Sequence, residues 1–210
     1  MEIIQNSINS IVIENNEEFE QFVIRLSNRI NGEDFYFVSD EEKMTLFNRM
    51  RLIMSPFDLQ ISDRDLQKKL YAYLVEEIEN SNTFEKLIEI HGNLVSCIDE
   101  TIILNDYDIE YDDEFSIFAI LKAIGAKLKP FEGSFCNKMV ESAKVCRNFL
   151  GKDYFVICNC NSYINDQDYE YLEKWAKYNE ITLVFLQNQQ IMWQTNVNEY
   201  IIDKDLCVLH

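Results

Sequence analysis

The amino-acid sequence predicts an α/β protein in which the two ends of the chain form one domain, with a partly parallel sheet, around an inserted helical domain. Apolar runs typical of buried strands lie near both ends of the 210-residue chain. Helical periodicity dominates the middle. Only 5 glycines and 2 prolines are present, too few for a loop-rich all-β fold. We therefore expect residues 1–60 and 151–210 to form the α/β head and residues 61–150 to form a helical leg.

The first sixty residues contain alternating signals for strands and helices. Residues 3–13 predict a strand with a turn at an Asn/Ser cluster. Apolar residues at helical spacing predict a helix over 16–30, which Asn31-Gly32 ends. Short apolar runs at 35–38 and 50–55 predict two further strands.

The middle of the chain predicts four helices. Residues 63–79 and 83–98 each place apolar side chains on one face. A third helix is expected over 113–128 and a fourth over 134–150, separated by the break at Pro130–Gly133. This pattern predicts an insertion built from two long helical hairpins.

The last sixty residues return to strand and helix signals. The nearly continuous apolar run at 154–160 is typical of a strand covered on both faces. A helix capped by Asp166 and a second buried strand at 181–186 follow. Together they predict a right-handed β-α-β unit with parallel strands. A final short strand is expected at 200–202 or 206–209.

Charge is unevenly distributed along this acidic chain. Lys and Arg number 19 against 37 Asp and Glu, a net charge of −18. A uniform charge of this size would repel phosphate backbones. It would favour solubility, an acidic partner surface or bound cations. Two segments depart from uniformity, and these segments determine the functional hypotheses.

The first segment is acidic and contains no base. Residues 99–114 hold eight acids, and six of them fall within nine residues, alternating with Tyr107, Ile109 and Tyr111. The six candidate metal ligands are Asp106, Asp108, Glu110, Asp112, Asp113 and Glu114. Carboxylates without His or Cys favour Ca²⁺ over a transition metal, although the EF-hand spacing is absent. A solvated acidic turn before a helix N-terminus explains part of the pattern equally well. Both interpretations remain open.

The second segment, residues 122–152, is basic. Its seven candidate DNA-binding residues are Lys122, Lys127, Lys129, Lys138, Lys144, Arg147 and Lys152. Only Glu132 and Glu141 oppose them. These cations could be ordinary helix positions that pair with acids elsewhere. A symmetric assembly that pointed them inward would instead create a basic surface for sequence-independent contact with phosphates.

Motifs of the common enzyme classes are absent from the sequence. There is no GxxxxGK[ST], GxGxxG or GxSxG. Glu41-Glu42-Lys43 superficially resembles the end of a nuclease motif but reads better as a solvated helix start. His91 lies on an apolar helix face, as expected for a structural histidine, and His210 ends the chain. We therefore expect a protein that is not an enzyme.

The six cysteines form no CxxC pair or zinc pattern. We expect no signal peptide, because the N-terminal MEIIQNSINS has no basic n-region followed by an apolar h-region, and no apolar run is long enough to cross a membrane. We therefore expect reduced thiols in a cytoplasmic protein.

Three stretches together resemble one family. DIEYDDEFSIFAILKAIGAKL resembles the hallmark region of the type II-A CRISPR accessory proteins of spacer acquisition, the Csn2 family. YFVICNCNSYINDQDYEYLEKWAKYNEITLVFLQ is similar to the strand, asparagine-containing loop, helix and strand of that family. EYIIDKDLCVLH resembles its terminal segment. The three stretches come in the family's order and cover about half the chain, from roughly residue 105 to the end.

The resemblance implies properties that the residues alone do not. Such proteins form homotetrameric rings of α/β heads with helical legs, and the head resembles a P-loop fold without the Walker motif. The resemblance implies Ca²⁺ in the region of Asp108–Glu114 and binding of double-stranded DNA ends, which thread through a basic central hole. It also implies partners in adaptation, namely the CRISPR integrase proteins and the effector nuclease.

Two alternatives stand beside this hypothesis. An acidic protein-interaction scaffold, or a DNA mimic, would be a monomer or dimer whose basic segment is buried or paired. A degenerate NTPase or nuclease would show cation-dependent turnover, although the missing motifs disfavour it.

Overall fold

The chain forms two compact units. A computed structural model describes residues 2–28, 38–39, 42–43, 48–55, 57–60, 64–104, 107, 109–111, 114–190 and 197–209. Unit 1 comprises Met1–Ile61 and Pro130–His210, and unit 2 comprises Ser62–Lys129. The insertion begins where the sequence predicts it, near residue 61. It ends at Lys129, earlier than the expected residue 150.

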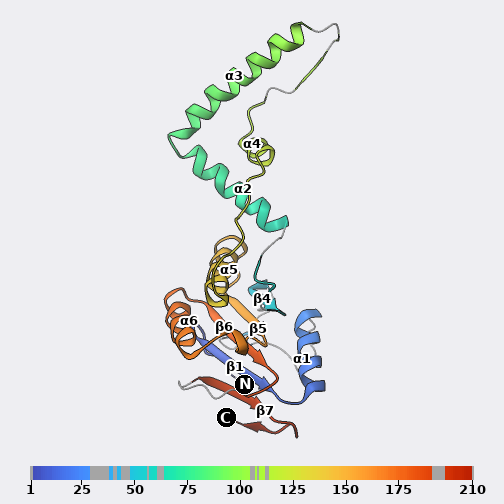
Figure 1. The fold of residues 1–210 in the computed structure, drawn as a ribbon, viewed down its shortest axis with the longest axis vertical. Coiled ribbons are helices and arrows are strands. Elements are labelled where there is room, and N and C mark those ends of the chain that lie inside the picture. The colour runs from blue at the N-terminus through green and yellow to red at the C-terminus, as the bar shows by residue number, and fades with distance from the viewer. Residues whose placement is uncertain are drawn as a thin grey trace. The chain divides into compact units, whose positions relative to one another are not determined.

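A six-stranded sheet forms the centre of unit 1 (Figure 1). Its strand order is β4 (Met50–Ile53), β5 (Tyr154–Cys158), β6 (Thr182–Gln187), β1 (Ile8–Ile13), β7 (Asn198–Ile202) and β8 (Val208–Leu209). All neighbours pair in parallel except β7 and β8. Both segments proposed for the last strand are therefore strands. The predicted α/β class with a partly parallel sheet is confirmed.

Helices cover both faces of the sheet. Along β5, Phe155 and Ile157 join the core beneath α5 (Phe135–Leu150) and α6 (Asp166–Tyr178). Val156 and Cys158 join the opposite core, which also contains Val23 and Leu26 of α1 (Asn16–Asn28). Successive strand residues point to opposite faces. This two-sided burial explains why the β5 sequence is continuously apolar.

Helix α5 belongs to the α/β head, which corrects the expected domain boundary. We expected this helix within the insertion of residues 61–150. Its buried side chains include Cys136, Met139, Ala143 and Cys146, and all four lie in the core against the sheet. An amphipathic repeat shows that a helix has a buried face, but not which element covers that face. Here the cover is the sheet.

Two smaller elements complete unit 1. β2 (Val38–Ser39) and β3 (Glu42–Lys43) pair as a separate antiparallel hairpin. The expected strand at 35–38 therefore lies largely outside the described residues. A short 3-10 helix, Asn161–Tyr163, follows β5. α6 is capped by Asn165 and not by Asp166, because the Asn165 side chain accepts from the Asp168 N–H while Asp168 accepts from the Asn165 N–H.

Unit 2 is a helical hairpin with a third, shorter helix. α2 (Arg64–Glu79) and α3 (Thr83–Ile103) form the hairpin, and α4 (Ile117–Ala123) packs on α2 through Ile117, Leu121 and Tyr71. α4 is shorter than the expected helix over 113–128. The side chain of Ser116 caps its start, and Gly125 at φ 66° lies just beyond its end.

Candidate nucleic-acid interface

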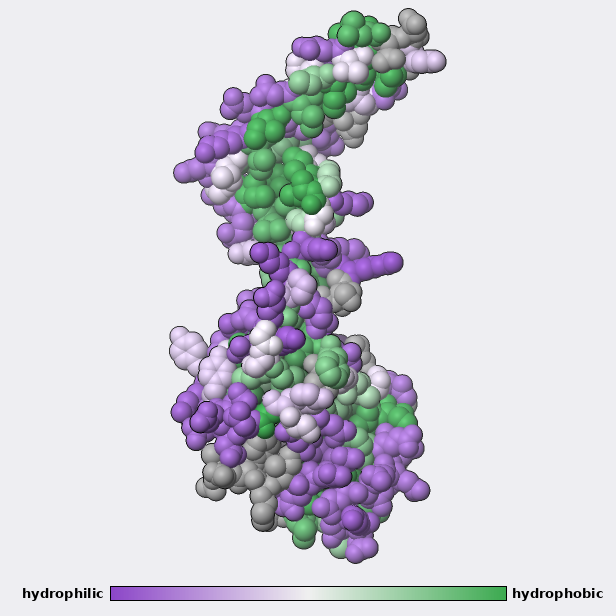
Figure 2. All heavy atoms as spheres, viewed as in Figure 1, coloured by the Kyte–Doolittle hydropathy of each residue, from purple (hydrophilic) through white to green (hydrophobic). Residues whose placement is uncertain are grey.

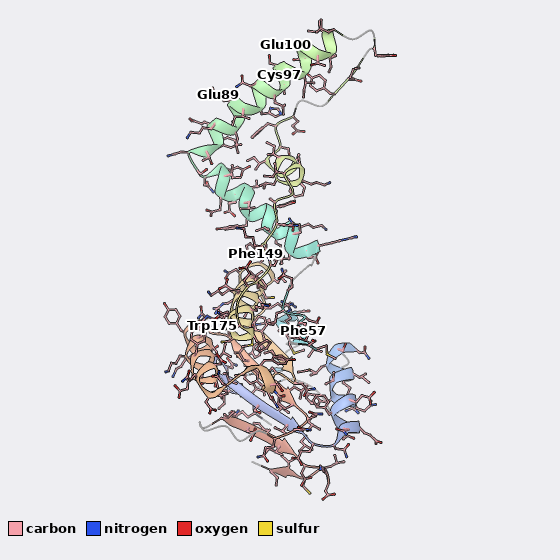
Figure 3. The ribbon with its side chains drawn as sticks, in the orientation of Figure 1. Phe57, Glu89, Cys97, Glu100, Phe149 and Trp175 are labelled. Carbon is pink, nitrogen blue, oxygen red and sulfur yellow. The ribbon has the colours of Figure 1, made fainter. Side chains whose placement is uncertain are left out.

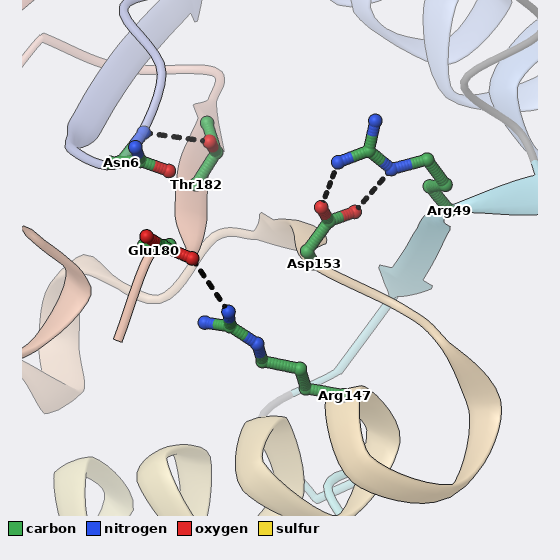
Figure 4. Close-up of polar contacts among 6 residues, drawn as sticks. All are labelled: Asn6, Arg49, Arg147, Asp153, Glu180 and Thr182. Atoms are coloured by element: carbon green, nitrogen blue, oxygen red, sulfur yellow. Dashed lines mark hydrogen bonds and ion pairs between the residues drawn. The ribbon is translucent and has the colours of Figure 1, made fainter. Parts of the chain in front are cut away.

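Cations gather at the edge of the sheet where parallel strands β4 and β5 begin. Arg49 precedes β4, and its Nε donates to Asp153 Oδ1 at 2.9 Å while its Nη2 contacts the other oxygen of that carboxylate (Figure 4). This hydrogen bond raises the pKa of Arg49 above its usual value. Lys152 Nζ donates to the Asn48 carbonyl at 2.6 Å. Both cations thus link the residues before β4 to those before β5. For Lys152, one hydrogen bond of the ammonium group serves this structural contact.

Two further cations lie in the last turns of α5, which leads into this edge. Arg147 Nη2 is 2.9 Å from Glu180 Oε2 (Figure 4), and Lys144 Nζ is 2.9 Å from Glu141 Oε1. The Glu180 side chain is 71% exposed and that of Lys144 is 46% exposed. Ion pairs this open to water contribute about 0–1 kcal/mol. A phosphate group could therefore replace either carboxylate at small cost.

A pocket of about 390 Å³ opens beside these two cations. It is lined by Lys144, Arg147, Asn148, Tyr178, Asn179 and Ile181. These residues come from the C-terminal parts of α5 and α6 and from the turn into β6. The pocket therefore combines cationic, amide and aromatic groups on one side of unit 1.

The remaining predicted cations divide between the two units. Lys122 lies on α4, and Lys127 and Lys129 follow it, all three exposed in unit 2. Within the described ranges, none of the three forms an ion pair. Residues 115–131 contain these lysines and no acid. Lys138 is half-buried on α5, and helical geometry places it about 120° around the helix from Lys144. The basic segment is therefore not one continuous face.

The acidic segment is described only in part. Asp106, Asp108, Asp112 and Asp113 lie outside the described residues, while Glu110 and Glu114 are exposed. No group of three or more His, Cys, Asp or Glu residues that could hold a metal forms among the residues described. All six candidate ligands are carboxylates, a donor set suited to Ca²⁺. The calcium site thus stays a prediction.

One contact within unit 2 ties the acidic segment to α3. The Tyr111 hydroxyl is hydrogen-bonded to Asp99 Oδ1 on that helix. Asp99 also lies among the eight acids of residues 99–114. The acidic segment is therefore anchored to α3 at one described point.

Helix α3 has an apolar surface that unit 2 leaves uncovered. One side packs on Phe115, whose ring lies 6.0 Å from that of Phe84 and 5.2 Å from that of His91. His91 is thus half-buried in a structural contact. No residue of α3 is buried. Ile90 is 61% exposed and Leu94 57%, and Figure 2 shows apolar side chains gathered along this helix. A surface of this kind indicates an interaction partner.

The N-terminus of α1 is already occupied by a side chain. In parallel α/β proteins, helix N-termini are ready anion sites because their N–H groups are free. Here Asn15 Oδ1 accepts from the N–H groups of Glu17 and Glu18 at 3.1 and 3.2 Å. Both glutamates also place negative charge in the first helical turn. This geometry disfavours phosphate binding at the end of β1.

Four of the six cysteines are buried. Burial raises the pKa of the Cys136 and Cys158 thiols to about 11 and that of Cys160 to about 12. Cys146 is also buried, whereas Cys97 on α3 (Figure 3) and Cys207 are exposed. All six are free thiols.

This distribution predicts selective alkylation of the folded protein. Near pH 8, N-ethylmaleimide should modify Cys97 and Cys207 and leave the buried four intact, because only an accessible thiolate reacts readily. Mass spectrometry of the intact protein should show two adducts in native buffer and six in denaturant. Early modification of Cys160 in native buffer would contradict the buried position.

Sequence reasoning missed three residues of this region. Arg49 directly precedes a predicted strand, so its place at the sheet edge could have been found from the parallel pairing of that strand with the run that follows Lys152. Tyr178 and Asn148 had no such signal. Their pocket exists only because α5 and α6 pack on the same face of the sheet.

Comparison with protein families gives a match across most of the chain. The family model for the CRISPR-associated protein Cas_Csn2 matches residues 29–206. A protein named CRISPR-associated protein Csn2 from Streptococcus agalactiae is 19% identical over 167 residues, which cover 79% of this chain and 74% of that protein. One of the same name from Enterococcus faecalis is 19% identical over 180 residues, covering 81% and 80%.

Solved structures with partial similarity come from ABC transporters. The cbiO1 protein of Clostridium perfringens, part of the ABC transporter complex cbiONQ, is 12% identical with a TM-score of 0.45, and the alignment covers 90% of this chain and 70% of that one. A putative ABC transporter ATP-binding protein from Pyrococcus furiosus is 9% identical with a TM-score of 0.41, over 96% and 86%. Scores this low support no inference about function. None of the described helices is both long and apolar enough to span a membrane.

Proposed function

Because the chain belongs to the Cas_Csn2 family of CRISPR-associated proteins, we propose that it binds the ends of double-stranded DNA as a calcium-dependent homotetrameric ring. Binding is independent of DNA sequence and supports the acquisition of new spacers in type II-A CRISPR immunity. The protein acts in the cytoplasm with the CRISPR integrase proteins and the effector nuclease. It is a binding protein and not an enzyme.

The exposed lysines of unit 2 carry the DNA-binding part of the proposal. Lys122, Lys127 and Lys129 lie in a segment without acids, although the whole chain has a net charge of −18. Lysines that neutralise phosphates release condensed counterions, which gives sequence-independent affinity. In a ring with the lysines lining the hole, symmetry would repeat this segment in every protomer. The acidic remainder would keep DNA away from the outer surface.

The uncovered apolar side of α3 supports the proposed assembly into a tetramer. Its exposed residues, Ile90 and Leu94 among them, are costly to leave in water. A second copy of the chain would cover them in a closed assembly. Bound calcium would offset the repulsion among the carboxylates of the acidic segment, which is anchored to α3 through Tyr111 and Asp99.

The N-terminus of α1 supports a role without nucleotide hydrolysis. In a P-loop the backbone N–H groups of this region cradle phosphates. Asn15 fills those positions here, and Glu17 and Glu18 add negative charge. Neither feature suits a nucleoside triphosphate.

A comparison of linear and circular DNA tests the proposal. The protein should bind linear duplex in Ca²⁺ and lose it when a chelator is added, as measured by gel shift and fluorescence anisotropy. Closed circular duplex of the same sequence should bind much more weakly, because it has no end to thread. Linearising that circle with a restriction enzyme is the matched control. Equal binding of the closed and cut forms would contradict threading.

One observation favours a second candidate, an acidic interaction scaffold that does not bind DNA. Lys144 and Arg147 already pair with Glu141 and Glu180 of the same chain. A scaffold would remain a monomer or dimer in Ca²⁺ and would not bind linear duplex even at low salt. Size-exclusion chromatography with light scattering, run with and without linear DNA, separates the two candidates.

A further inference from the structure

We propose that the pocket at the C-terminal ends of α5 and α6 binds an unpaired nucleotide, with its base against Tyr178 and its phosphate against Lys144 and Arg147. The natural ligand would be a single-stranded overhang at the end of the bound DNA. The inference rests on the proposed function only for the source of that strand, since the pocket itself is built from residues of unit 1.

The pocket has the groups that a nucleotide requires. Tyr178 is the last residue of α6 and is 88% exposed, so a base can stack on one face of its ring. Base–aromatic stacking tolerates any sequence because every base has a π-face. Buried Ile181 forms an apolar part of the wall. The volume of about 390 Å³ lies within the range of about 300–1,000 Å³ that is usual for small-ligand sites.

The two cations are placed to receive a phosphate. Arg147 uses Nη2 for Glu180, and Lys144 uses its Nζ for Glu141, at 2.9 Å each. These acids are exposed surface partners and hold the cations weakly. A guanidinium offers several donors in a planar fork and an ammonium offers three, so each can bind phosphate in addition to a carboxylate or in its place.

The amide side chains complete the pocket on its polar side. Asn148 is exposed on α5 in the turn that also holds Arg147. Asn179 Nδ2 donates to the Trp175 carbonyl at 2.8 Å, which holds that side chain in place. An amide presents both donors and an acceptor, so it can meet the polar edge of any base without selecting one. The pocket is therefore suited to unpaired nucleotides of unspecified sequence.

Two DNA probes and a matched pair of tyrosine variants test the inference. The probes are a blunt duplex and the same duplex with a short oligothymidine 3′ overhang, each titrated in Ca²⁺ by fluorescence anisotropy. The variants are Tyr178→Ala and Tyr171→Ala. Tyr171 lies on the same helix, is 49% exposed and does not line the pocket. Circular dichroism and thermal melting verify that both variants fold.

We expect the overhang to raise the affinity of the wild-type protein roughly tenfold, the usual effect of one stacked base. Tyr178→Ala should remove this gain and leave affinity for blunt duplex unchanged, while Tyr171→Ala keeps the gain. A wild-type protein that binds both probes equally well would overturn the inference while leaving the proposed function intact. A gain that survives in Tyr178→Ala would overturn it too.

A third probe separates this inference from the proposed function. If blunt duplex does not bind at all, the proposed function fails, and labelled single-stranded oligothymidine then measures the pocket directly. The inference is supported if the wild-type protein and Tyr171→Ala bind this oligonucleotide and Tyr178→Ala does not. It is overturned if the wild-type protein does not bind the oligonucleotide. Competition by free thymidine monophosphate shows how much of the strand the pocket requires. Displacement means that one base and one phosphate suffice, and retention means that the neighbouring strand contributes to nucleotide binding.

Discussion

Replacing Lys122, Lys127 and Lys129 together by glutamate is expected to lower affinity for linear duplex DNA by about a hundredfold or more at moderate salt. The substitutions reverse the charge of the one segment, residues 115–131, that holds three lysines and no acid. The side chains are exposed, so the apolar contacts of α4 with α2 are left intact. Anisotropy titrations at several salt concentrations should also give a shallower slope of log affinity against log salt.

A second triple variant in the same unit controls for net charge. Lys68, Lys69 and Lys86 are also exposed, but they lie on α2 and α3. Their replacement by glutamate changes the charge of the chain equally. We expect this control to weaken DNA binding only several-fold, through long-range repulsion. Equal losses in the two triple variants would show that net charge alone matters and that the three lysines are not the interface.

The double substitution Ile90→Glu and Leu94→Glu is expected to dissociate the tetramer that we propose. Both side chains are more than half exposed in the single chain, so the fold of unit 2 should lose little stability. If a second copy covers them, each would contribute about 1.5–3 kcal/mol per protomer. Two such losses in every protomer would weaken the interface by orders of magnitude. Light scattering should therefore report a smaller species in Ca²⁺, and circular dichroism should report unchanged helix content.

Asn93→Glu with Ser96→Glu gives the matched control for the assembly prediction. These two residues are exposed on α3, where helical geometry places Asn93 about 60° and Ser96 about 120° around the helix from Ile90, and the change adds the same charge to the same helix. The control should keep the wild-type size. A tetramer that persists in the Ile90→Glu, Leu94→Glu variant would place the interface elsewhere. DNA binding measured on both variants then shows whether assembly is required for affinity.

Much of the head could be predicted because its strands are buried on both faces. Phe155 and Val156 are adjacent yet lie in opposite cores, and this burial imposes the apolar run seen in the sequence. The place of α5 could not be predicted in the same way. Its spacing of Cys136, Met139, Ala143 and Cys146 would suit a helical hairpin equally well. The element that packs on a helix is determined by the tertiary structure, and the periodicity of the helix sequence does not indicate it.

The candidate interface was predictable in composition but not in arrangement. The seven cations of residues 122–152 form one run in sequence, yet they lie in two units, and Arg147 meets Glu180 only because α5 ends near the turn into β6. Residue types therefore indicated phosphate contact, while the pairings depended on the fold. The acidic segment still rests on sequence alone, because Asp106, Asp108, Asp112 and Asp113 lie outside the described residues.

The position of β1 between β6 and β7 has a consequence for synthesis on the ribosome. Asn9 pairs with Val184 on one side and with Asn198 on the other. The nascent head therefore cannot complete its sheet until β6 and β7 have been translated. Unit 2 is continuous over Ser62–Lys129, and its contacts are more local, so it can fold while the head is unfinished. A ribosome stalled before β6 would thus present a formed leg on an incomplete sheet, a state that chaperones would be expected to protect.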